Sequence, residues 1–138
     1  MNVLVDTSIW SLVLRRGVPR EHIVTKDLSE LIRELRVQII GPIRQELLSG
    51  IKSENQFEEL RLYLAAFPDL LLATADFEKA AEFFNVCRRN GIQGSNTDFL
   101  ICSVAHRRDL EIFTSDNDFL DFQQYLPIKL YSPRTGAI

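Results

Sequence analysis

The side chains best suited to chemistry in this 138-residue sequence are four acids that lie far apart along the chain. Asp6, Glu46, Asp98 and Asp116 each follow a short apolar run or lie on the first turns of a predicted helix. Carboxylate oxygens are the hard ligands that Mg²⁺ and Mn²⁺ select. If the fold gathers these four side chains, they form a site for a divalent cation.

The apolar pattern predicts the elements that position these acids. Short β-branched or leucine-rich runs indicate strands, and apolar residues at helical spacing indicate helices. We expect strands over residues 2–5, 37–40, 70–73, 111–114 and 128–131. We expect helices from about residues 7, 26 and 42, over 54–66, 76–90 and 96–108, and briefly within SDNDFLDF near residue 118. Strands alternating with helices predict an α/β fold around a mainly parallel sheet.

Several boundaries of these elements carry local signals. Gly50 suits the C-terminal cap of the helix that begins near residue 42. Ser53 and Gln56 fit a capping box for the next helix, and Thr74 or Asp76 is expected to cap the helix over 76–90. The helix over 96–108 is almost wholly apolar, which predicts that it is central.

In open α/β sheets, sites lie beyond the carboxyl ends of the strands, so this topology brings the four acids to one edge. Two unit charges about 4 Å apart repel by about 4 kcal/mol at an effective dielectric of 20. Several converging carboxylates therefore cost an amount comparable with a domain's stability of roughly 5–15 kcal/mol. Helix capping explains single acids at such positions, whereas a bound cation explains why they gather.

Length and composition are those of one globular domain over residues 1–138. The net charge of −3 does not favour a protein that coats nucleic acid, although an enzyme with an acidic site remains compatible with it. The arginine pairs 15–16, 88–89 and 107–108 are interpreted as solvated helix faces. His22 and His106 are too few and too scattered for a zinc site.

The N-terminal run contains Asp6 and has no basic leader, so we do not expect a signal peptide. No apolar stretch approaches the roughly 20 residues that span a membrane, so no membrane partner is expected. Cys87 and Cys102 fall in apolar helical contexts without metal-binding spacing. They predict buried free thiols in a reducing cytoplasm.

Four segments resemble, in order and spacing, the motifs of PIN-domain ribonucleases, and most closely the VapC-type toxins of toxin–antitoxin pairs. They are VLVDTSIW (3–10), QELLSG (45–50), TDFLICSVA (97–105) and IFTSDNDF (112–119). The resemblance covers essentially the whole chain. It implies a three-layer α/β/α sandwich with a central, mainly parallel sheet.

The resemblance also implies roles for the acids. Asp6, Glu46, Asp98 and Asp116 would be catalytic, with Asp6, Asp98 and Asp116 holding one or two Mg²⁺ or Mn²⁺ ions. Glu46 would be a ligand or would orient water, and Asp118 is a secondary candidate ligand. The metal would lower the pKa of its bound water, which would then cleave RNA to leave a 5′-phosphate and a 3′-hydroxyl.

Hydroxyl groups beside these acids match positions that, by the resemblance, hold the acids, water or substrate. They are Thr7, Ser8, Thr114 and Ser115, and Arg15 is added as a predicted substrate contact. The resemblance further implies an RNA substrate, a homodimer and a cognate antitoxin. The C-terminal segment of that antitoxin would cover the acidic groove.

Three other functions are compatible with the sequence. An aspartate-based phosphatase or phosphotransferase would use Asp6 as its nucleophile, but the haloacid-dehalogenase pattern requires a second acid where this chain has Ser8. A non-catalytic protein-binding module would not need the acids to converge. A DNA-directed nuclease of related fold would normally carry inserted arches, for which this chain is short.

Overall fold

The computed structural model describes residues 1–14 and 22–134, so the predicted substrate contact Arg15 lies outside the described residues. The strands are β1 (Val3–Val5), β2 (Val37–Gln38), β3 (Glu111–Phe113) and β4 (Lys129–Leu130). The helices are α1 (Thr7–Leu14), α2 (Ile23–Arg33), α3 (Gly41–Leu48), α4 (Glu54–Leu64), α5 (Thr74–Arg89), α6 (Asn96–Arg107) and α7 (Asp118–Gln123). Every predicted helix is present, although α2 begins earlier than its periodicity indicated.

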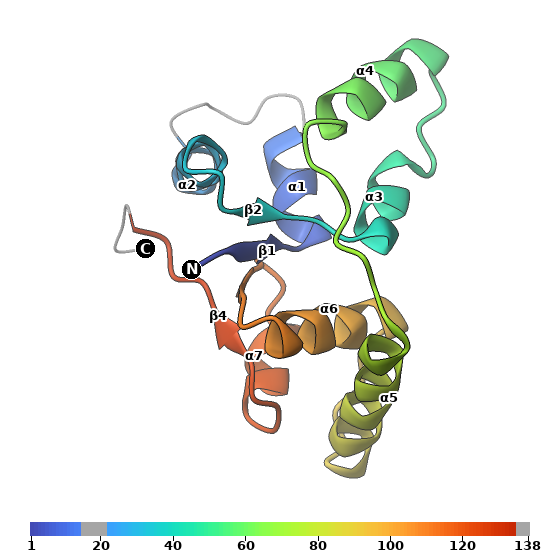
Figure 1. The fold of residues 1–138 in the computed structure, drawn as a ribbon, viewed down its shortest axis with the longest axis vertical. Coiled ribbons are helices and arrows are strands. Elements are labelled where there is room, and N and C mark those ends of the chain that lie inside the picture. The colour runs from blue at the N-terminus through green and yellow to red at the C-terminus, as the bar shows by residue number, and fades with distance from the viewer. Residues whose placement is uncertain (15–21, 135–138) are drawn as a thin grey trace.

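The four strands form one parallel sheet in the order β2-β1-β3-β4. Val3 of β1 pairs with Val37 on one side and with Glu111 on the other. Figure 1 shows α1–α4 gathered towards the β2 edge and α5–α7 towards the β4 edge. This arrangement confirms the predicted α/β fold with helices around a parallel sheet. Because β1 and β3 are neighbours, the segments that follow them begin side by side.

β1 and α6 lie at the centre of the hydrophobic core. All three residues of β1 are buried, and α6 buries seven consecutive residues, 99–105. Fully burying a leucine or phenylalanine side chain contributes about 1.5–3 kcal/mol. Asp6 directly follows β1 and Asp98 directly precedes the buried part of α6, so well-packed elements hold both acids. The prediction that residues 96–108 form a central helix is confirmed.

The predicted strand over residues 70–73 is wrong. Ile39 and Asp69 form an isolated parallel bridge, and the Leu70 N–H donates to the Ile39 carbonyl at 2.9 Å. The pairing does not continue, because β2 is only two residues long and Leu71 is 90% exposed. Strands of a parallel sheet are normally buried on both faces. The segment instead connects α4 with α5.

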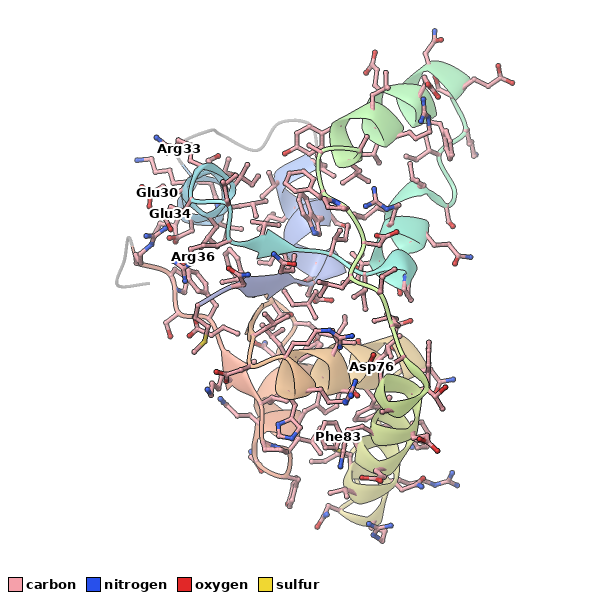
Figure 2. The ribbon with its side chains drawn as sticks, in the orientation of Figure 1. Glu30, Arg33, Glu34, Arg36, Asp76 and Phe83 are labelled. Atoms are coloured by element: carbon pink, nitrogen blue, oxygen red, sulfur yellow. The ribbon has the colours of Figure 1, made fainter. Side chains whose placement is uncertain are left out.

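The start of α5 is fixed by a buried acid rather than by the predicted cap. The N-cap residue is Ala73, not Thr74 or Asp76, and the fully buried Asp76 carboxylate accepts a hydrogen bond from the Ala73 N–H at 2.7 Å. Arg107 and Arg108 each approach Asp76 Oδ1 at 2.6 Å. This corrects the interpretation of that pair as a solvated helix face, because the pair ties the end of α6 to Asp76 at the start of α5. Figure 2 labels Asp76 at this position.

Cys87 and Cys102 are buried free thiols, as predicted. Burial, and then the negative charge of Asp98, raise the pKa of the Cys102 thiol well above its usual range, which keeps the thiol protonated. Among residues 1–14 and 22–134, none of the helices is both long enough and apolar enough to cross a membrane.

Candidate active site

Asp6 lies at the junction of β1 and α1, where its carboxylate is nearly buried. Its backbone N–H donates to the Phe113 carbonyl at 2.9 Å, which extends the β1–β3 pairing by one step, and the residue is 6% exposed. Two hydroxyls donate to the same oxygen, Oδ2: Ser8 Oγ at 2.8 Å and Thr114 Oγ1 at 2.8 Å. These bonds fix the orientation of the carboxylate.

The same two hydroxyls accept hydrogen bonds from the turn after β3. The Ser115 N–H donates to Ser8 Oγ at 3.0 Å, and the Asp116 N–H donates to Thr114 Oγ1 at 3.0 Å. Asp116 Oδ1 in turn accepts a hydrogen bond from the Asp118 N–H at 2.9 Å. A continuous network therefore joins the predicted acids Asp6 and Asp116 through the hydroxyls, and Asp118 takes part through its backbone.

Asp98 occupies the third position of α6. Its Oδ2 accepts a hydrogen bond from the Ser95 N–H at 3.1 Å, and its own N–H donates to Ser95 Oγ at 3.0 Å, so the pair forms a capping box. Burial raises the pKa of Asp98, and the charges of Asp6 and Asp116 raise it further, against the effect of the Ser95 hydrogen bonds. The capping role is therefore present, and Asp98 lies close enough to Asp6 and Asp116 for their charges to disfavour its ionised form.

Glu46 enters the site from α3. It is exposed, and its Oε2 accepts a hydrogen bond from Thr7 Oγ1 at 3.0 Å, which links it to the residue next to Asp6. A hollow of about 560 Å³ lies here between α3 and the first turns of α1 and α6, and Thr97 is among its lining residues. Thr97 was not predicted as a site residue. Its position beside Asp98 was the only signal for it.

The described residues show no basic counterpart for these acids. None of the ion pairs within residues 1–14 and 22–134 involves Asp6, Asp98 or Asp116. Over the same residues, no three His, Cys, Asp or Glu side chains are already arranged as a metal-binding group. The geometry thus brings hard oxygen donors to one edge of the sheet, whereas metal ligation by them stays a prediction.

Comparison with known proteins identifies the family to which this arrangement belongs. The sequence profile of the PIN domain matches residues 3–124, which include β1, β3 and all four predicted catalytic acids. The chain belongs to the PIN-domain family. The four quoted motifs therefore lie within a region that matches as a whole.

Two ribonucleases resemble the chain over most of its length. The VapC ribonuclease Mb1587 of Mycobacterium bovis and the ribonuclease VapC11 of Mycobacterium tuberculosis are each 31% identical over 121 residues, covering 85% of this chain and 88% of the relative.

Solved structures share the fold at lower sequence identity. FitAcB from Neisseria gonorrhoeae has a TM-score of 0.77 at 21% identity and covers 97% of this chain and 99% of its own. VapBC2 from Rickettsia felis, bound to a fragment of its promoter DNA, has a TM-score of 0.75 at 19% identity and covers 95% and 98%. A toxin–antitoxin complex from Klebsiella pneumoniae has a TM-score of 0.61 at 20% identity, with 86% and 90% covered.

Proposed function

We propose that this chain is a metal-dependent endoribonuclease and the toxin of a toxin–antitoxin pair. Membership of the PIN-domain family and the similarity to two VapC ribonucleases support this activity. The observation that carries the proposal is the placement of Asp6, Asp98 and Asp116 at one sheet edge, where Thr114 links Asp6 to Asp116 and none of the three acids has an ion pair among the described residues. Residues 1–138 would form one nuclease domain.

The chemistry of the donor set fits Mg²⁺ or Mn²⁺. Asp6, Asp98 and Asp116 would hold the ion, and Asp118 is a secondary ligand on the following turn. Carboxylates and hydroxyls are hard donors, and a positive ion would favour the ionised form of Asp98, whose pKa is raised by burial and by the charges of Asp6 and Asp116. When bound, the ion supplies a water nucleophile at neutral pH and offsets charge on the phosphate.

The remaining side chains position these groups. Ser8 and Thr114 hold Asp6 in one orientation, so that its other oxygen keeps a fixed direction. Thr7 holds Glu46, which would orient the attacking water on the side of the hollow beside Glu46. Ser115 lies on the exposed turn where an RNA backbone would approach. Cleavage would leave a 5′-phosphate and a 3′-hydroxyl.

The partners follow from the same assignment. The substrate would be RNA, the inhibitor would be a cognate antitoxin that covers the acidic groove, and the toxin would be a homodimer. The fold similarity to VapBC2 and to a toxin–antitoxin complex supports a partner of this kind. The chain would act in the cytoplasm, which agrees with its two free thiols.

The test compares RNA cleavage by the purified wild type and by Asp6→Asn, each with Mg²⁺, with Mn²⁺ and with EDTA. We expect cleavage only for the wild type with metal, together with growth arrest when the wild type is expressed. Asp109→Asn is the matched control, because Asp109 is an exposed aspartate at the other end of α6 and pairs only with Lys129 among the described side chains. Cleavage that persists both in EDTA and in Asp6→Asn would contradict the proposal.

A further inference from the structure

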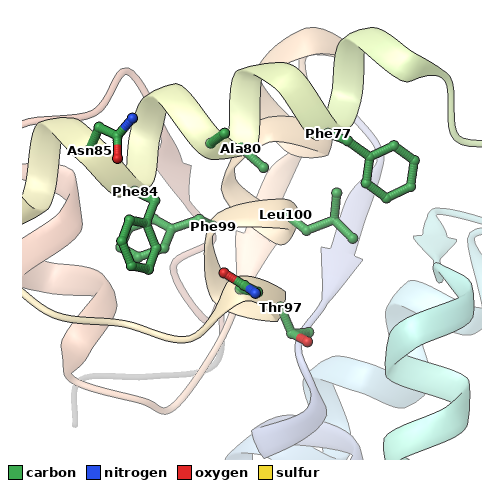
Figure 3. Close-up of a pocket in the computed structure, with 9 residues that line it drawn as sticks. Phe77, Ala80, Phe84, Asn85, Thr97, Phe99 and Leu100 are labelled. Carbon is green, nitrogen blue, oxygen red and sulfur yellow. The ribbon is translucent and has the colours of Figure 1, made fainter.

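A second hollow, of about 440 Å³, lies between α5 and α6 next to the acidic site. Phe77, Ala81 and Phe84 line it from α5, and Leu100 lines it from α6. Figure 3 shows the rings of Phe77 and Phe84 at opposite ends of this hollow, with Leu100 between them. Phe77 is 52% exposed, so an aromatic face is presented to solvent here. We call this space the α5–α6 hollow.

Polar groups complete the lining of the α5–α6 hollow. Asn85 of α5 and Asn96 and Thr97 of α6 all contribute to it. An asparagine amide both donates and accepts hydrogen bonds, and a threonine hydroxyl does the same. Aromatic walls combined with a few amides and hydroxyls suit a planar ligand whose edge carries donors and acceptors. A nucleobase is such a ligand.

The α5–α6 hollow shares lining residues with two other hollows. Thr97 also lines the hollow beside Glu46, so one residue separates the predicted reaction site from the aromatic walls. At the other end, Phe84 and Phe99 are shared with a third hollow of about 340 Å³, which is also lined by Arg88. Shared lining residues therefore link the hollow beside Glu46, the aromatic walls and the exposed Arg88, and we call the surface from Thr97 to Arg88 the track.

We propose that the α5–α6 hollow is a base-binding subsite, which takes an unpaired nucleobase next to the cleaved linkage of the RNA substrate. Phe77 would stack on the base, Asn85 or Asn96 would contact its edge, and Arg88 would contact the phosphate of the following nucleotide. Aromatic platforms beside a basic group are the usual means of binding single-stranded nucleic acid, and unstacked bases are read at their edges. The inference rests on the proposed ribonuclease function.

A protein partner fits these observations less well than RNA does. A protein interface would bury Phe77 equally well, but it would not explain why the hollow adjoins the acids through Thr97 and ends at Arg88. A strand of RNA that crosses the acids must continue over neighbouring surface. The track from Thr97 to Arg88 supplies stacking and charge in that order.

The first experiment detects where RNA binds in a variant that does not cleave it. Asp6→Asn protein is irradiated with RNA oligonucleotides that carry one 4-thiouridine at successive positions around the principal cut site, and the crosslinked peptides are identified by mass spectrometry. We expect crosslinks to peptides containing Phe77 or Phe84 from one or two adjacent nucleotide positions. Crosslinks that fall only on other peptides would overturn the subsite.

The second experiment measures affinity and cut-site preference. In the Asp6→Asn background, Phe77→Ala should weaken oligonucleotide binding about fivefold or more, as stacking contributes about 1–3 kcal/mol per base. In active protein, Asn85→Ala or Asn96→Ala should relax the base preference at the crosslinked position. Tyr125→Ala is the matched control, because it removes another half-exposed aromatic ring that does not line the three hollows.

The remaining outcomes separate this inference from the proposed function. If the wild type cleaves RNA but Phe77→Ala leaves affinity and cut-site preference unchanged, only the subsite is wrong. If the wild type does not cleave RNA, the proposed function itself fails. If Phe77→Ala and Ala81→Arg convert a dimer into a monomer by light scattering while affinity is unchanged, the α5–α6 hollow is a contact between copies, and the subsite is again overturned.

Discussion

Thr114 Oγ1 donates a hydrogen bond to Oδ2 of Asp6 at 2.8 Å, although the two residues are 108 positions apart in the sequence. The same hydroxyl accepts a hydrogen bond from the Asp116 N–H at 3.0 Å. One side chain therefore orients one predicted metal ligand and positions the backbone of another. Groups that hydrogen-bond a metal ligand, without contacting the metal themselves, fix the orientation of that ligand and affect metal affinity.

Replacing Thr114 with valine keeps the shape of the side chain but removes both hydrogen bonds. We expect metal affinity or cleavage activity to fall about 10- to 100-fold, which is the usual cost of losing an outer partner of a metal ligand. Thr114→Ser should retain most of the activity, because its hydroxyl can make the same bonds. The measurement is RNA cleavage as a function of Mn²⁺ concentration. Equal activity of the valine and serine variants would show that the hydroxyl has no such role.

Asp98→Asn should make the metal-free protein more stable while abolishing cleavage. The raised pKa of Asp98 means that its ionised form is unfavourable in the folded state. The resulting loss of stability is absent below the ordinary carboxyl range near pH 4 and is complete above the raised pKa. Asparagine removes the charge, while its side-chain oxygen can still accept the Ser95 hydrogen bond.

The measurement for Asp98→Asn is the melting temperature with EDTA at pH 4 and at pH 7.5. We expect the variant to melt above the wild type at pH 7.5, and we expect the difference to shrink at pH 4. Adding Mg²⁺ at pH 7.5 should stabilise the wild type and not the variant. A variant that melts below the wild type at both pH values would contradict the conclusion that the ionised form of Asp98 is unfavourable in the folded protein. Asp98→Ala is the control, because it removes the charge and also the oxygen that accepts the Ser95 hydrogen bond.

Asp76→Asn should destabilise the fold without acting on the site directly. Its two hydrogen bonds to Arg108, together with those to Ala73 and Arg107, hold the pKa of the buried Asp76 well below its usual range. Its stabilising effect is therefore complete above the unfolded carboxyl pKa near 4 and is lost as the pH falls further. Breaking a buried ion pair from one side costs about 3–5 kcal/mol.

Urea unfolding at pH 7 should therefore show a loss of about 3 kcal/mol for Asp76→Asn. The difference from the wild type should narrow below pH 4. Glu82→Gln serves as the control, since it breaks an exposed ion pair with Lys79 on the same helix, and such pairs contribute about 0–1 kcal/mol. Equal losses for the two variants would contradict the structural role of Asp76.

Gly94→Ala tests the packing beneath the turn that leads to Asp98. A Cβ at residue 94 would lie 2.6 Å from Phe122 Cζ and 3.0 Å from the ring of Phe99, so one of these core rings must shift. Overpacking of this kind typically costs about 1–3 kcal/mol. Gly41→Ala is the matched control, because its nearest neighbour in the structure, an Asp69 oxygen, is 4.0 Å away. In urea unfolding, we expect Gly94→Ala to lower the free energy of unfolding and Gly41→Ala to leave it nearly unchanged. Equal losses for the two variants would contradict the overpacking at residue 94.

Local patterns predicted most of the fold. The helices were found because each has an amphipathic or apolar run bounded by a cap or a break, as at Ser53, whose Oγ accepts the Gln56 N–H. The strand predicted over 70–73 failed because a leucine-rich run does not reveal whether a neighbouring strand is long enough to pair with it. Arg107 and Arg108 were misread for a similar reason, since their buried partner Asp76 lies on another helix.

The site was predicted less completely than the fold. The positions of Asp6 and Asp116 were predicted because sites in open α/β sheets lie beyond the carboxyl ends of the strands. Ser8 and Thr114 were predicted as hydroxyls beside these acids. That both hydroxyls donate to one oxygen of Asp6 depends on the register of β1 against β3, which a single sequence does not contain. The α5–α6 hollow depends on how two helices pack, so a local sequence motif could not predict it.

The pairing of β1 with β3 also determines when the site can form during translation of the chain. These strands are adjacent in the sheet but are joined by more than half of the polypeptide, and contacts of such long range form late and slowly. A growing chain on the ribosome therefore carries Asp6 long before Thr114 and Asp116 emerge. If Asp6 and Asp116 act together as proposed, the active site can form only after nearly all of the chain has been translated.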